Sequence, residues 1–313
     1  MSFPVNRRKF LKGAAGAAMA SASTLPLVVP RRARALSGGS PPWAVTFDGN
    51  TYLTTQGEVA NMPTSSPYGL LSYWYNNLAT MGQPILLQNI LDQWYDNTVW
   101  IVMNQFSGNG SNQALGKLQL DFAPDANYDQ VMEMMTDDIL PVDGNWHHVI
   151  AAWDTNGGQV LGSVDGVPVA FSDQRGVSYG LPFAPSYGFP WQIGGSVADG
   201  WGVYFSGDLA EFFLLIPGNF IDPTDPTVMA RFRDPNTGLP VRIGSTGWDV
   251  FADLGLVPQI WLSGPASLFP QNLAAGTWTW PATYTDTTPS SAFVTAAGGL
   301  MTAATDPWGN STS

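Results

Sequence analysis

From residue 44 onwards the sequence is a succession of short apolar or alternating runs, separated by Gly, Pro, Asn and Asp, and no long window repeats with the helical period. Short runs rich in β-branched and aromatic residues, bounded by turn residues, are typical of antiparallel strands. The pattern therefore predicts an all-β protein. The runs expected to be strands are Ala44–Asp48, Tyr52–Thr55, Leu70–Tyr75, Ile85–Asn89, Thr98–Asn104, Lys117–Phe122, Gln130–Met134, Trp191–Gly194 and Asp208–Ile216.

The clearest pattern lies between Trp146 and Phe171. Asp154–Gly158 is a cluster of turn residues, and Asp165-Gly166 suits a two-residue hairpin turn, which needs positive φ at both central positions. This spacing predicts a three-stranded meander with strands at Trp146–Trp153, Gln159–Val164 and Val167–Phe171.

One short helix is expected near the C-terminal end. Thr224 or Asp225 can cap it, and Pro226 fits its first turn, where a missing N–H costs nothing. Arg231 and Arg233 fall in the expected last turn, where cations suit the helix dipole.

The first 35 residues read as an export signal. The basic segment Asn6–Lys12 precedes an apolar run over residues 13–29, and Ala33-Arg34-Ala35 offers a small-residue cleavage site. The paired arginines followed by Phe-Leu-Lys resemble the twin-arginine signal. A membrane anchor is the alternative, but a run of 17 residues containing Pro26 is a poor span. The protein is therefore expected in the periplasm or outside the cell.

The rest of the chain divides by composition into four parts. We expect a linker over residues 36–43, a β-sandwich over 44–216, an extension packed on it over 217–281, and a loosely attached tail over 282–313. No stretch after the signal approaches about 18 uninterrupted apolar residues, so no membrane span is expected after cleavage.

The charge balance after residue 35 is strongly acidic. This part of the chain contains five basic residues and all 24 acidic residues, so its formal net charge is −19. Binding to nucleic acid requires several cations to neutralise phosphates, so nucleic acid is not an expected partner. The chain has no Cys, which excludes disulfides, thiolate metal sites and thiol nucleophiles. The five basic residues are Lys117, Arg175, Arg231, Arg233 and Arg242.

Catalytic patterns are sparse, and no catalytic residue is assigned. The only histidines, His147 and His148, are adjacent on an expected strand, so we expect one to face inward and the other the solvent or a neighbouring strand. Sandwich glucanases carry several carboxylates at alternate positions of one strand, whereas Glu133 is alone in residues 131–135. A protein without enzymatic activity is favoured, although carboxylates from separate strands could still meet in space.

Two kinds of ligand site are suggested by loop residues. Trp201 and Asp199 lie in a glycine-rich loop, where a flat aromatic face and a carboxylate suit a sugar. Calcium takes six to eight oxygen ligands, usually from loops. The same acidic residues also suit turns in which they bond their own backbone. The candidate calcium ligands are Asp48, Asn50, Asp154, Asp165, Asp199 and Asp208.

Several segments resemble, in order and spacing, the strands of laminin-G-like domains. The resemblance covers about residues 44 to 216 and implies the laminin-G/pentraxin branch of the concanavalin A-like lectin/glucanase superfamily. The fold it implies is a two-sheet antiparallel jelly roll. The segments are Val45–Leu53, Leu71–Tyr75, Asn145–Asp154, Val164–Val169, Ile193–Ser196 and Phe205–Phe212.

In that fold the first and last strands lie side by side. The resemblance therefore implies that Asp48 lies near Asp208 and Glu211, as a calcium site or a hydrogen-bonded cluster. The acidic calcium pairs of the family are not recognisable residue by residue, so no ligand role is carried over.

The favoured function is an exported, non-enzymatic module that binds a carbohydrate or a cell-surface protein, with calcium dependence left open. Two alternatives remain: a glycan-active hydrolase or lyase with carboxylates from separate strands, and a structural protein of an envelope or a phage-like particle. Folds of this type support all three roles, so the fold cannot choose among them.

Overall fold

The computed structural model describes residues 43–55, 59, 61–76, 88–93, 99–104, 117–122, 132–173, 182, 190–196, 203–241, 251–271, 276–279, 283–286, 293–295, 301–305 and 307. All of them belong to one unit, residues 34–313. The export signal predicted for residues 1–35 and the linker to residue 42 lie outside the described residues. In the described part of the chain, no helix is long and apolar enough to cross a membrane.

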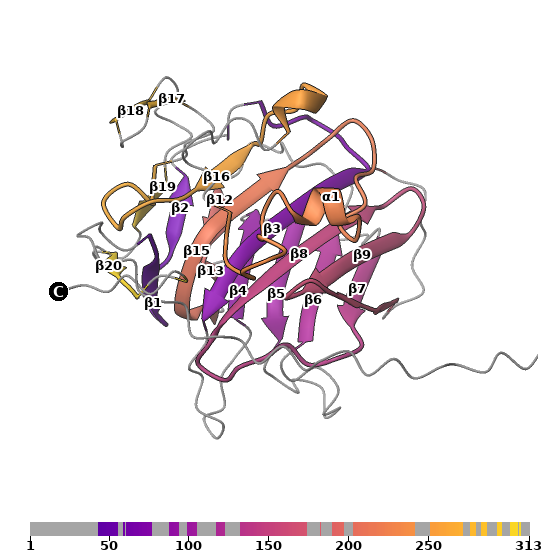
Figure 1. The fold of residues 1–313 in the computed structure, drawn as a ribbon, viewed down its shortest axis with the longest axis horizontal. Helices are drawn as coiled ribbons and strands as arrows, with labels where there is room; N and C mark the ends of the chain where they lie inside the picture. Colours follow the sequence, from indigo (N-terminus) through magenta and orange to yellow (C-terminus); the bar gives the residue numbers. More distant parts are fainter. Residues whose placement is uncertain are drawn as a thin grey trace, which may run out of the picture. The chain divides into compact units, whose positions relative to one another are not determined.

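Two antiparallel eight-stranded sheets form the framework (Figure 1). Sheet A has the order β10-β9-β8-β3-β15-β1-β20, and β16 also pairs with β15. Its strands are β1 (Val45–Asp48), β3 (Tyr68–Asn76), β8 (Trp146–Asp154), β9 (Gln159–Val164), β10 (Val167–Val169), β15 (Ser206–Leu215), β16 (Ile260–Leu262) and β20 (Thr302–Ala303).

Sheet B has the order β11-β7-β6-β5-β4-β12-β2-β19 and lies behind sheet A in Figure 1. Its strands are β2 (Leu53–Thr55), β4 (Gln88–Gln93), β5 (Val99–Asn104), β6 (Lys117–Phe122), β7 (Met132–Thr136), β11 (Phe171–Asp173), β12 (Trp191–Ile193) and β19 (Phe293–Thr295). Two further pairs are β13 (Gly195–Ser196) with β14 (Val203–Tyr204), and β17 (Gly276–Thr279) with β18 (Thr283–Asp286).

This arrangement confirms the predicted two-sheet antiparallel sandwich. The first and last strands of the predicted sandwich do pair, because β1 lies against β15 with Thr46 opposite Asp208. The third strand of the predicted meander differs. Instead of one strand over Val167–Phe171, the chain leaves sheet A after β10 and enters sheet B as β11. A strand that changes sheets in this way joins the two layers at one edge of the sandwich.

Alternating side chains fill the space between the sheets. Trp153 of β8 in sheet A and Phe122 of β6 in sheet B are both fully buried, and their ring centroids are 4.7 Å apart. This contact spans the two layers, since its two rings come from opposite sheets. The core therefore forms between the sheets, as the inward-facing apolar residues of each strand require.

The outer face of sheet A is covered by residues that follow β15. Ile150 and Leu70 on that face pack in one cluster with Phe232, Phe251 and Trp261 of the C-terminal extension. The short helix α1 (Pro226–Met229) lies in front of this face in Figure 1. Its N-cap is Asp225, which accepts a hydrogen bond from the Thr227 backbone N–H, so one of the two predicted caps is used. The helix ends before Arg231 and Arg233, which differs from the expected last turn.

The C-terminal tail also differs from the loose attachment that was expected. Its β19 pairs with β2 in sheet B, and its β20 pairs with β1 in sheet A. The Trp146 indole N–H donates to the Thr305 carbonyl oxygen at 3.0 Å. A Thr- and Ala-rich segment has little strand signal of its own, but the unpaired edges of β1 and β2 offer it backbone hydrogen bonds.

Candidate functional site

A row of polar residues crosses the outer face of sheet B. Residues directly opposite one another in an antiparallel sheet share a face, so the strand register places a whole row on one side. We call this set the polar row. Its members, each opposite the next across neighbouring strands, are Thr54, Gln192, Asp92, Trp100, Asp121 and Glu133.

The adjacent row, one residue along each strand, has the opposite character. Its members are all apolar, and those with described side chains belong to the core between the sheets. The contrast follows from the two-residue period of a strand, which sends successive side chains to opposite faces. This apolar row consists of Leu53, Ile193, Leu91, Ile101, Leu120 and Met134.

Two carboxylates of the polar row lie close together. Asp121 of β6 faces Glu133 of β7, and Gln119 lies two residues before Asp121 on the same face. The Gln119 Nε2 group donates to Asp121 Oδ2 at 2.9 Å and to Glu133 Oε1 at 3.3 Å. Asp121 is 2% exposed and Glu133 is 7% exposed, so both carboxylates are buried. An amide between two carboxylates supplies donors and acceptors of the kind that hydroxyl groups bond.

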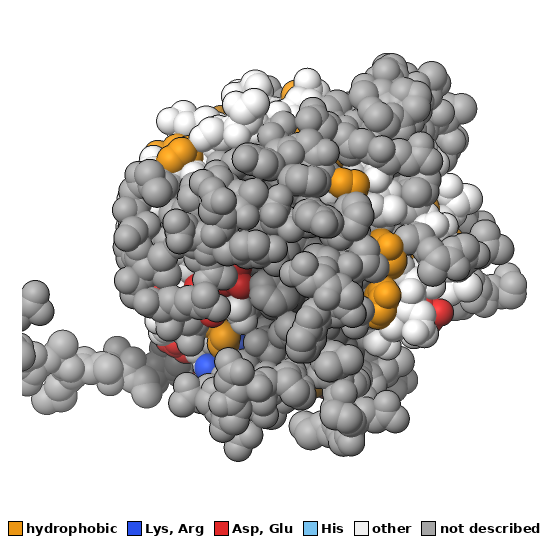
Figure 2. All heavy atoms as spheres, turned by 180° about the vertical axis from the view of Figure 1, so that it is seen from behind, with side chains coloured by type: hydrophobic (Ala, Val, Ile, Leu, Met, Phe, Trp, Pro, Cys, Tyr) orange, Lys and Arg blue, Asp and Glu red, His pale blue; other side chains and the backbone are white. Residues whose placement is uncertain are grey.

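Figure 2 shows the unit from behind sheet B, the side that carries the polar row. Most of the acidic side chains visible in this view gather in its left half, with a basic side chain beside them. Lys117, four residues before Asp121 on β6, lies on the same face by strand alternation and is partly exposed. Among the described residues of this face, the carboxylates are therefore accompanied by the Lys117 cation at the start of β6.

Sequence reasoning did not single out Asp121 and considered Glu133 only as an isolated carboxylate. The signal was present in part, because Lys117–Phe122 alternates strictly between polar and apolar residues, which places Asp121 away from the core. The register between β6 and β7 brings the two carboxylates together. Neither strand encodes that register alone, since the register is fixed by which pairing places the apolar residues of both strands in the core.

The ligand residues predicted from sequence, Asp199 and Trp201, lie outside the described residues. They fall in the segment between β13 and β14, which pair with Gly195 opposite Tyr204. The assignment of a ligand role to Asp199 and Trp201 stays a prediction.

The three acidic residues of the implied calcium cluster make separate contacts. Asp48 is exposed and accepts hydrogen bonds from the backbone N–H groups of Asn50 and Thr51, as a turn residue does. Asp208 accepts from the Thr46 hydroxyl at 2.8 Å, and burial raises its pKa. Glu211 is buried at a β-bulge and accepts from the Ser263 hydroxyl at 2.7 Å.

The bulge decides where Glu211 points. The register between β15 and β3 shifts between Ala210 and Phe213, and Glu211 has a φ of 47°. Within the described ranges, no three His, Asp or Glu side chains form a group that could hold a metal ion. Calcium binding by Asp48, Asp208 and Glu211 stays a prediction, and their observed contacts already satisfy part of each carboxylate.

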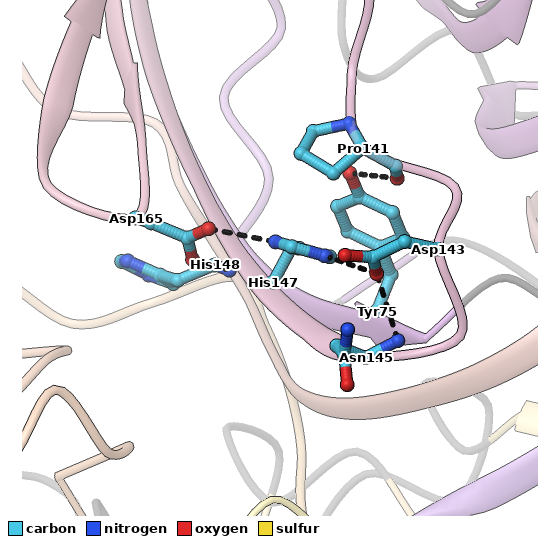
Figure 3. Close-up of polar contacts among 7 residues, drawn as sticks. All are labelled: Tyr75, Pro141, Asp143, Asn145, His147, His148 and Asp165. Atoms are coloured by element: carbon cyan, nitrogen blue, oxygen red, sulfur yellow. Dashed lines mark hydrogen bonds and ion pairs between the residues drawn. The ribbon is translucent and has the colours of Figure 1, made fainter. Parts of the chain in front are cut away.

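A second polar cluster surrounds His147 (Figure 3). His147 Nδ1 lies 2.7 Å from Asp165 Oδ2, and His147 Nε2 lies 2.9 Å from Asp143 Oδ1. Asp143 belongs to the loop before β8, and Asp165 belongs to the β9–β10 turn. A neutral imidazole has one N–H, so only the protonated ring can donate to both carboxylates. The cluster therefore links the loop to the turn through His147, and both hydrogen bonds can form when the ring is protonated.

The two histidines point to opposite faces of the strand, as expected, and both are buried, so neither faces the solvent. His148 faces the opposite side of sheet A, where its Nε2 lies 2.8 Å from the Ser72 hydroxyl and its ring stacks on Trp74. Burial lowers the pKa of His148 to about 3, so the ring is neutral at ordinary pH. The C-terminal extension covers this side of the sheet through Phe232, and sequence patterning could not reveal that cover.

The His147 cluster predicts a pH-dependent stability. Burial alone would lower the pKa of His147, but hydrogen bonds and charge from Asp165 and Asp143 outweigh it and raise the pKa above its usual value. This contribution is complete below the unfolded histidine pKa of about 6.5 and is lost as pH rises through the folded value. We expect the wild type to lose about 1–2 kcal/mol more than His147→Gln between about pH 6 and about pH 9, measured by urea unfolding.

At acidic pH the dependence of stability on pH is reversed, because stability is lost as pH falls. The hydrogen bond from His147 lowers the pKa of Asp143 to about 2, so the stability that Asp143 contributes above about pH 4 is lost as pH falls toward that value. Asp143→Asn is the matched variant. It should reduce both the loss of unfolding free energy toward high pH and the loss toward low pH. Identical pH profiles for the wild type and His147→Gln would contradict the histidine clamp.

No protein-family model and no curated protein sequence matches this chain. Solved structures do match it. A Bacteroides ovatus ATCC 8483 protein, provisionally described as carbohydrate binding, is similar with a TM-score of 0.50 and 16% identity, over 84% of this chain and 60% of that chain. This chain thus spans about 60% of the length of that protein. The likeness shows the fold, a two-sheet antiparallel β-sandwich.

Two other solved structures are similar over smaller parts. A heptameric pentraxin from Limulus polyphemus has a TM-score of 0.39 and 14% identity, over 57% of this chain and 77% of that chain. Domains LG4-5 of the mouse laminin α1 chain have a TM-score of 0.38 and 13% identity, over 60% of this chain and 46% of that chain.

Proposed function

We propose that this protein is an exported binding module that recognises a carbohydrate through the outer face of sheet B. The observation that carries the proposal is the group formed by Gln119, Asp121 and Glu133, in which an amide and two carboxylates from neighbouring strands share one face of sheet B. Sugars offer hydroxyl groups, which bond to such oxygens and amides, and C–H faces, which pack on aromatic rings. The description of the Bacteroides ovatus protein as carbohydrate binding is in line with this choice of ligand.

Charge also supports the choice among ligands. The chain after residue 35 carries a formal net charge of −19, and the proposed face has two adjacent carboxylates, so phosphate-rich and nucleic-acid ligands would be repelled. Sugars without acidic groups meet no such repulsion. The export part of the proposal rests on residues 1–35 and can be checked by the N-terminal sequence of the mature protein.

Binding to an array of neutral and acidic polysaccharides, followed by calorimetry on the strongest, tests the proposed function. We expect Asp121→Asn and Glu133→Gln each to weaken binding about ten-fold or more, because each removes a charged acceptor for a hydroxyl group. Asp138→Asn is the matched control, since it removes one carboxylate from an exposed position just after β7. An equal loss in the Asp138 variant, or no binding to any polysaccharide, would refute the proposed site.

Calcium dependence is a separate part of the proposal. The titration repeated in excess calcium and in a chelator tests it. Affinity that changes with calcium and is insensitive to Asp121→Asn would favour the predicted cluster of Asp48, Asp208 and Glu211 over the polar row.

A glycan hydrolase is the second candidate, and one specific observation favours it. The Asp121 and Glu133 oxygens that share Gln119 Nε2 are at most about 6 Å apart, and a separation of about 5–5.5 Å is typical of retaining glycosidases. In such a reaction one carboxylic acid protonates the glycosidic oxygen and the other carboxylate attacks the sugar carbon. Release of reducing ends by the wild type, lost in both Asp121→Asn and Glu133→Gln, would establish this activity over simple binding.

A further inference from the structure

A second row of polar residues crosses the outer face of sheet A. The strand register places its members opposite one another on β20, β1, β15, β3 and β8, which are successive neighbours in the sheet (Figure 1). Their neighbours along the strands, Val45, Leu209 and Tyr75, belong to the core, so the row points away from the core. We call this set the sheet A row. Its members are Thr302, Thr46, Asp208, Asn76 and Trp146.

The sheet A row reaches the surface of the protein. Thr302 is exposed, and the other four members are partly exposed. The C-terminal extension packs on the same face around Leu70, at the other end of β3. Six residues of strand separate Leu70 from Asn76, which corresponds to about 20 Å. A ligand can therefore approach the row beside the extension.

Asp208 supplies an acceptor at the centre of the row. Its Oδ1 accepts a hydrogen bond from the Thr46 hydroxyl at 2.8 Å, which fixes the orientation of the carboxylate. Burial raises the pKa of Asp208 by more than this hydrogen bond lowers it. In the described part of the chain, Oδ2 of Asp208 has no hydrogen-bond donor. A ligand hydroxyl that donates to Oδ2 would replace a hydrogen bond that partial burial removes.

Asn76 supplies a donor beside this acceptor. It lies directly opposite Asp208, and Cβ atoms in such pairs are about 4.5–5.5 Å apart. The Asn76 Oδ1 atom is buried without a partner among the described residues, which leaves Nδ2 as the polar atom on the accessible side. An acceptor and a donor at this spacing match two neighbouring hydroxyl groups of a sugar, since one hydroxyl can donate while the other accepts.

Trp146 supplies a fixed aromatic surface next to Asn76. Its ring packs on a cluster made by Ala44, Trp74, Ala210 and Ala304. Its indole N–H donates to the Thr305 carbonyl oxygen at 3.0 Å. The ring is therefore held before a ligand arrives, so stacking on it costs little side-chain entropy.

We propose that Asp208, Asn76 and Trp146 form a second carbohydrate site, on the outer face of sheet A, for a short neutral oligosaccharide. One hydroxyl donates to Asp208 Oδ2, its neighbour accepts from Asn76 Nδ2, and the C–H face of a sugar ring packs on Trp146. Two strand intervals, about 10 Å, separate β15 from β8, so a short ligand spans all three residues. The second site rests on the proposed function for its class of ligand, and not for its position.

Titration of ¹⁵N-labelled protein with cellotriose, laminaritriose and chitotriose, followed by NMR in the presence of a chelator, tests the second site. We expect Asp208→Asn, Asn76→Ala and Trp146→Ala each to weaken binding of the preferred trisaccharide about ten-fold. Trp146→Phe keeps an aromatic ring and should retain most of the affinity. Asp138→Asn is the control, because it removes an exposed carboxylate just after β7 of sheet B. Urea unfolding of each variant shows whether the fold is retained.

The indole N–H resonance of Trp146 provides a test on the wild-type sheet A row. It is identified by its absence from the spectrum of Trp146→Phe, and it should shift as the trisaccharide binds. The same shift is expected in the double variant Asp121→Asn with Glu133→Gln, because those residues belong to sheet B.

The outcomes separate the second site from the proposed function. Trisaccharide binding with no shift of the Trp146 resonance, or with full affinity in all three sheet A variants, would overturn the second site and leave the sheet B site standing. Binding that needs calcium, or binding of a polysaccharide without any of the trisaccharides, would also overturn the second site. The absence of binding to every sugar would instead overturn the proposed function itself.

Discussion

Replacing Trp153 by alanine is expected to lower the free energy of unfolding by about 3–5 kcal/mol, the range for a large aromatic residue removed from a core. Trp153 is fully buried on the inner face of β8, and its ring meets Phe122 of the opposite sheet at 4.7 Å. The chain makes room for the indole by having glycine opposite it. A Cβ atom on Gly69 would lie 2.0 Å from Trp153 Cζ2.

Urea unfolding followed by circular dichroism measures this effect. Trp146→Ala is the matched variant, because Trp146 lies on the same strand, is partly exposed and loses only its bond to the Thr305 carbonyl and its outer packing. We expect about 1 kcal/mol for this control. A Trp153 variant no less stable than the Trp146 variant would show that the contact between sheets is not a main source of stability.

Gly194→Ala is expected to lower the free energy of unfolding by about 2–5 kcal/mol, from two separate causes. Gly194 has a φ of 76°, which costs about 1–2 kcal/mol for an L-residue. A Cβ atom would also lie 2.2 Å from Phe47 Cε1, and overpacking of a core costs about 1–3 kcal/mol. Gly194 joins β12 to β13, and its carbonyl accepts from Phe205 N–H at 2.8 Å, so the segment bearing Tyr204 should be displaced as well.

Two other glycines separate the two causes. Gly255 has a φ of 67° with open space around it, so Gly255→Ala measures the backbone cost alone. Gly218 has neither a positive φ nor a close neighbour, and Gly218→Ala should change stability by less than about 0.5 kcal/mol. Unfolding midpoints and m-values for all three variants provide the comparison. The unfolding midpoint should fall furthest in Gly194→Ala. Equal losses of stability in the Gly194 and Gly255 variants would show that Phe47 moves aside.

The strands were largely predictable because their signals are local. Lys117–Phe122 was predicted with its exact bounds, since strict alternation between polar and apolar residues has one simple explanation. Ile85–Asn89 was less well placed, as β4 runs from Gln88 to Gln93. An apolar run without clear alternation does not mark where a strand begins, and pairing with β5 and β12 decides the bounds.

For the candidate site, the sequence predicted the types of residue involved but not which of them lie together. The sequence indicated carboxylates and aromatic residues on a sandwich, and it left open whether carboxylates from separate strands meet. Asp121 and Glu133 are twelve residues apart and come together through the pairing of β6 with β7. Asn76 and Asp208 are 132 residues apart and come together through the pairing of β3 with β15. Strand pattern alone predicts neither contact, because pairing depends on the packed sandwich.

By itself, the sequence determined the class of the protein. Turn residues at short intervals indicate short strands, alternation divides each strand into a core face and an outer face, and the scarcity of cations argues against a nucleic-acid ligand. These properties follow from neighbouring residues, so they can be read without the fold.

The tertiary structure decided which polar side chains share a surface. It set the register that lines up Asp121 with Glu133, covered His148 with the C-terminal extension, and joined Asp143 to Asp165 through His147. The physical reason is that the two-residue period of a strand determines its faces, whereas neighbours across strands depend on which register buries the apolar row best.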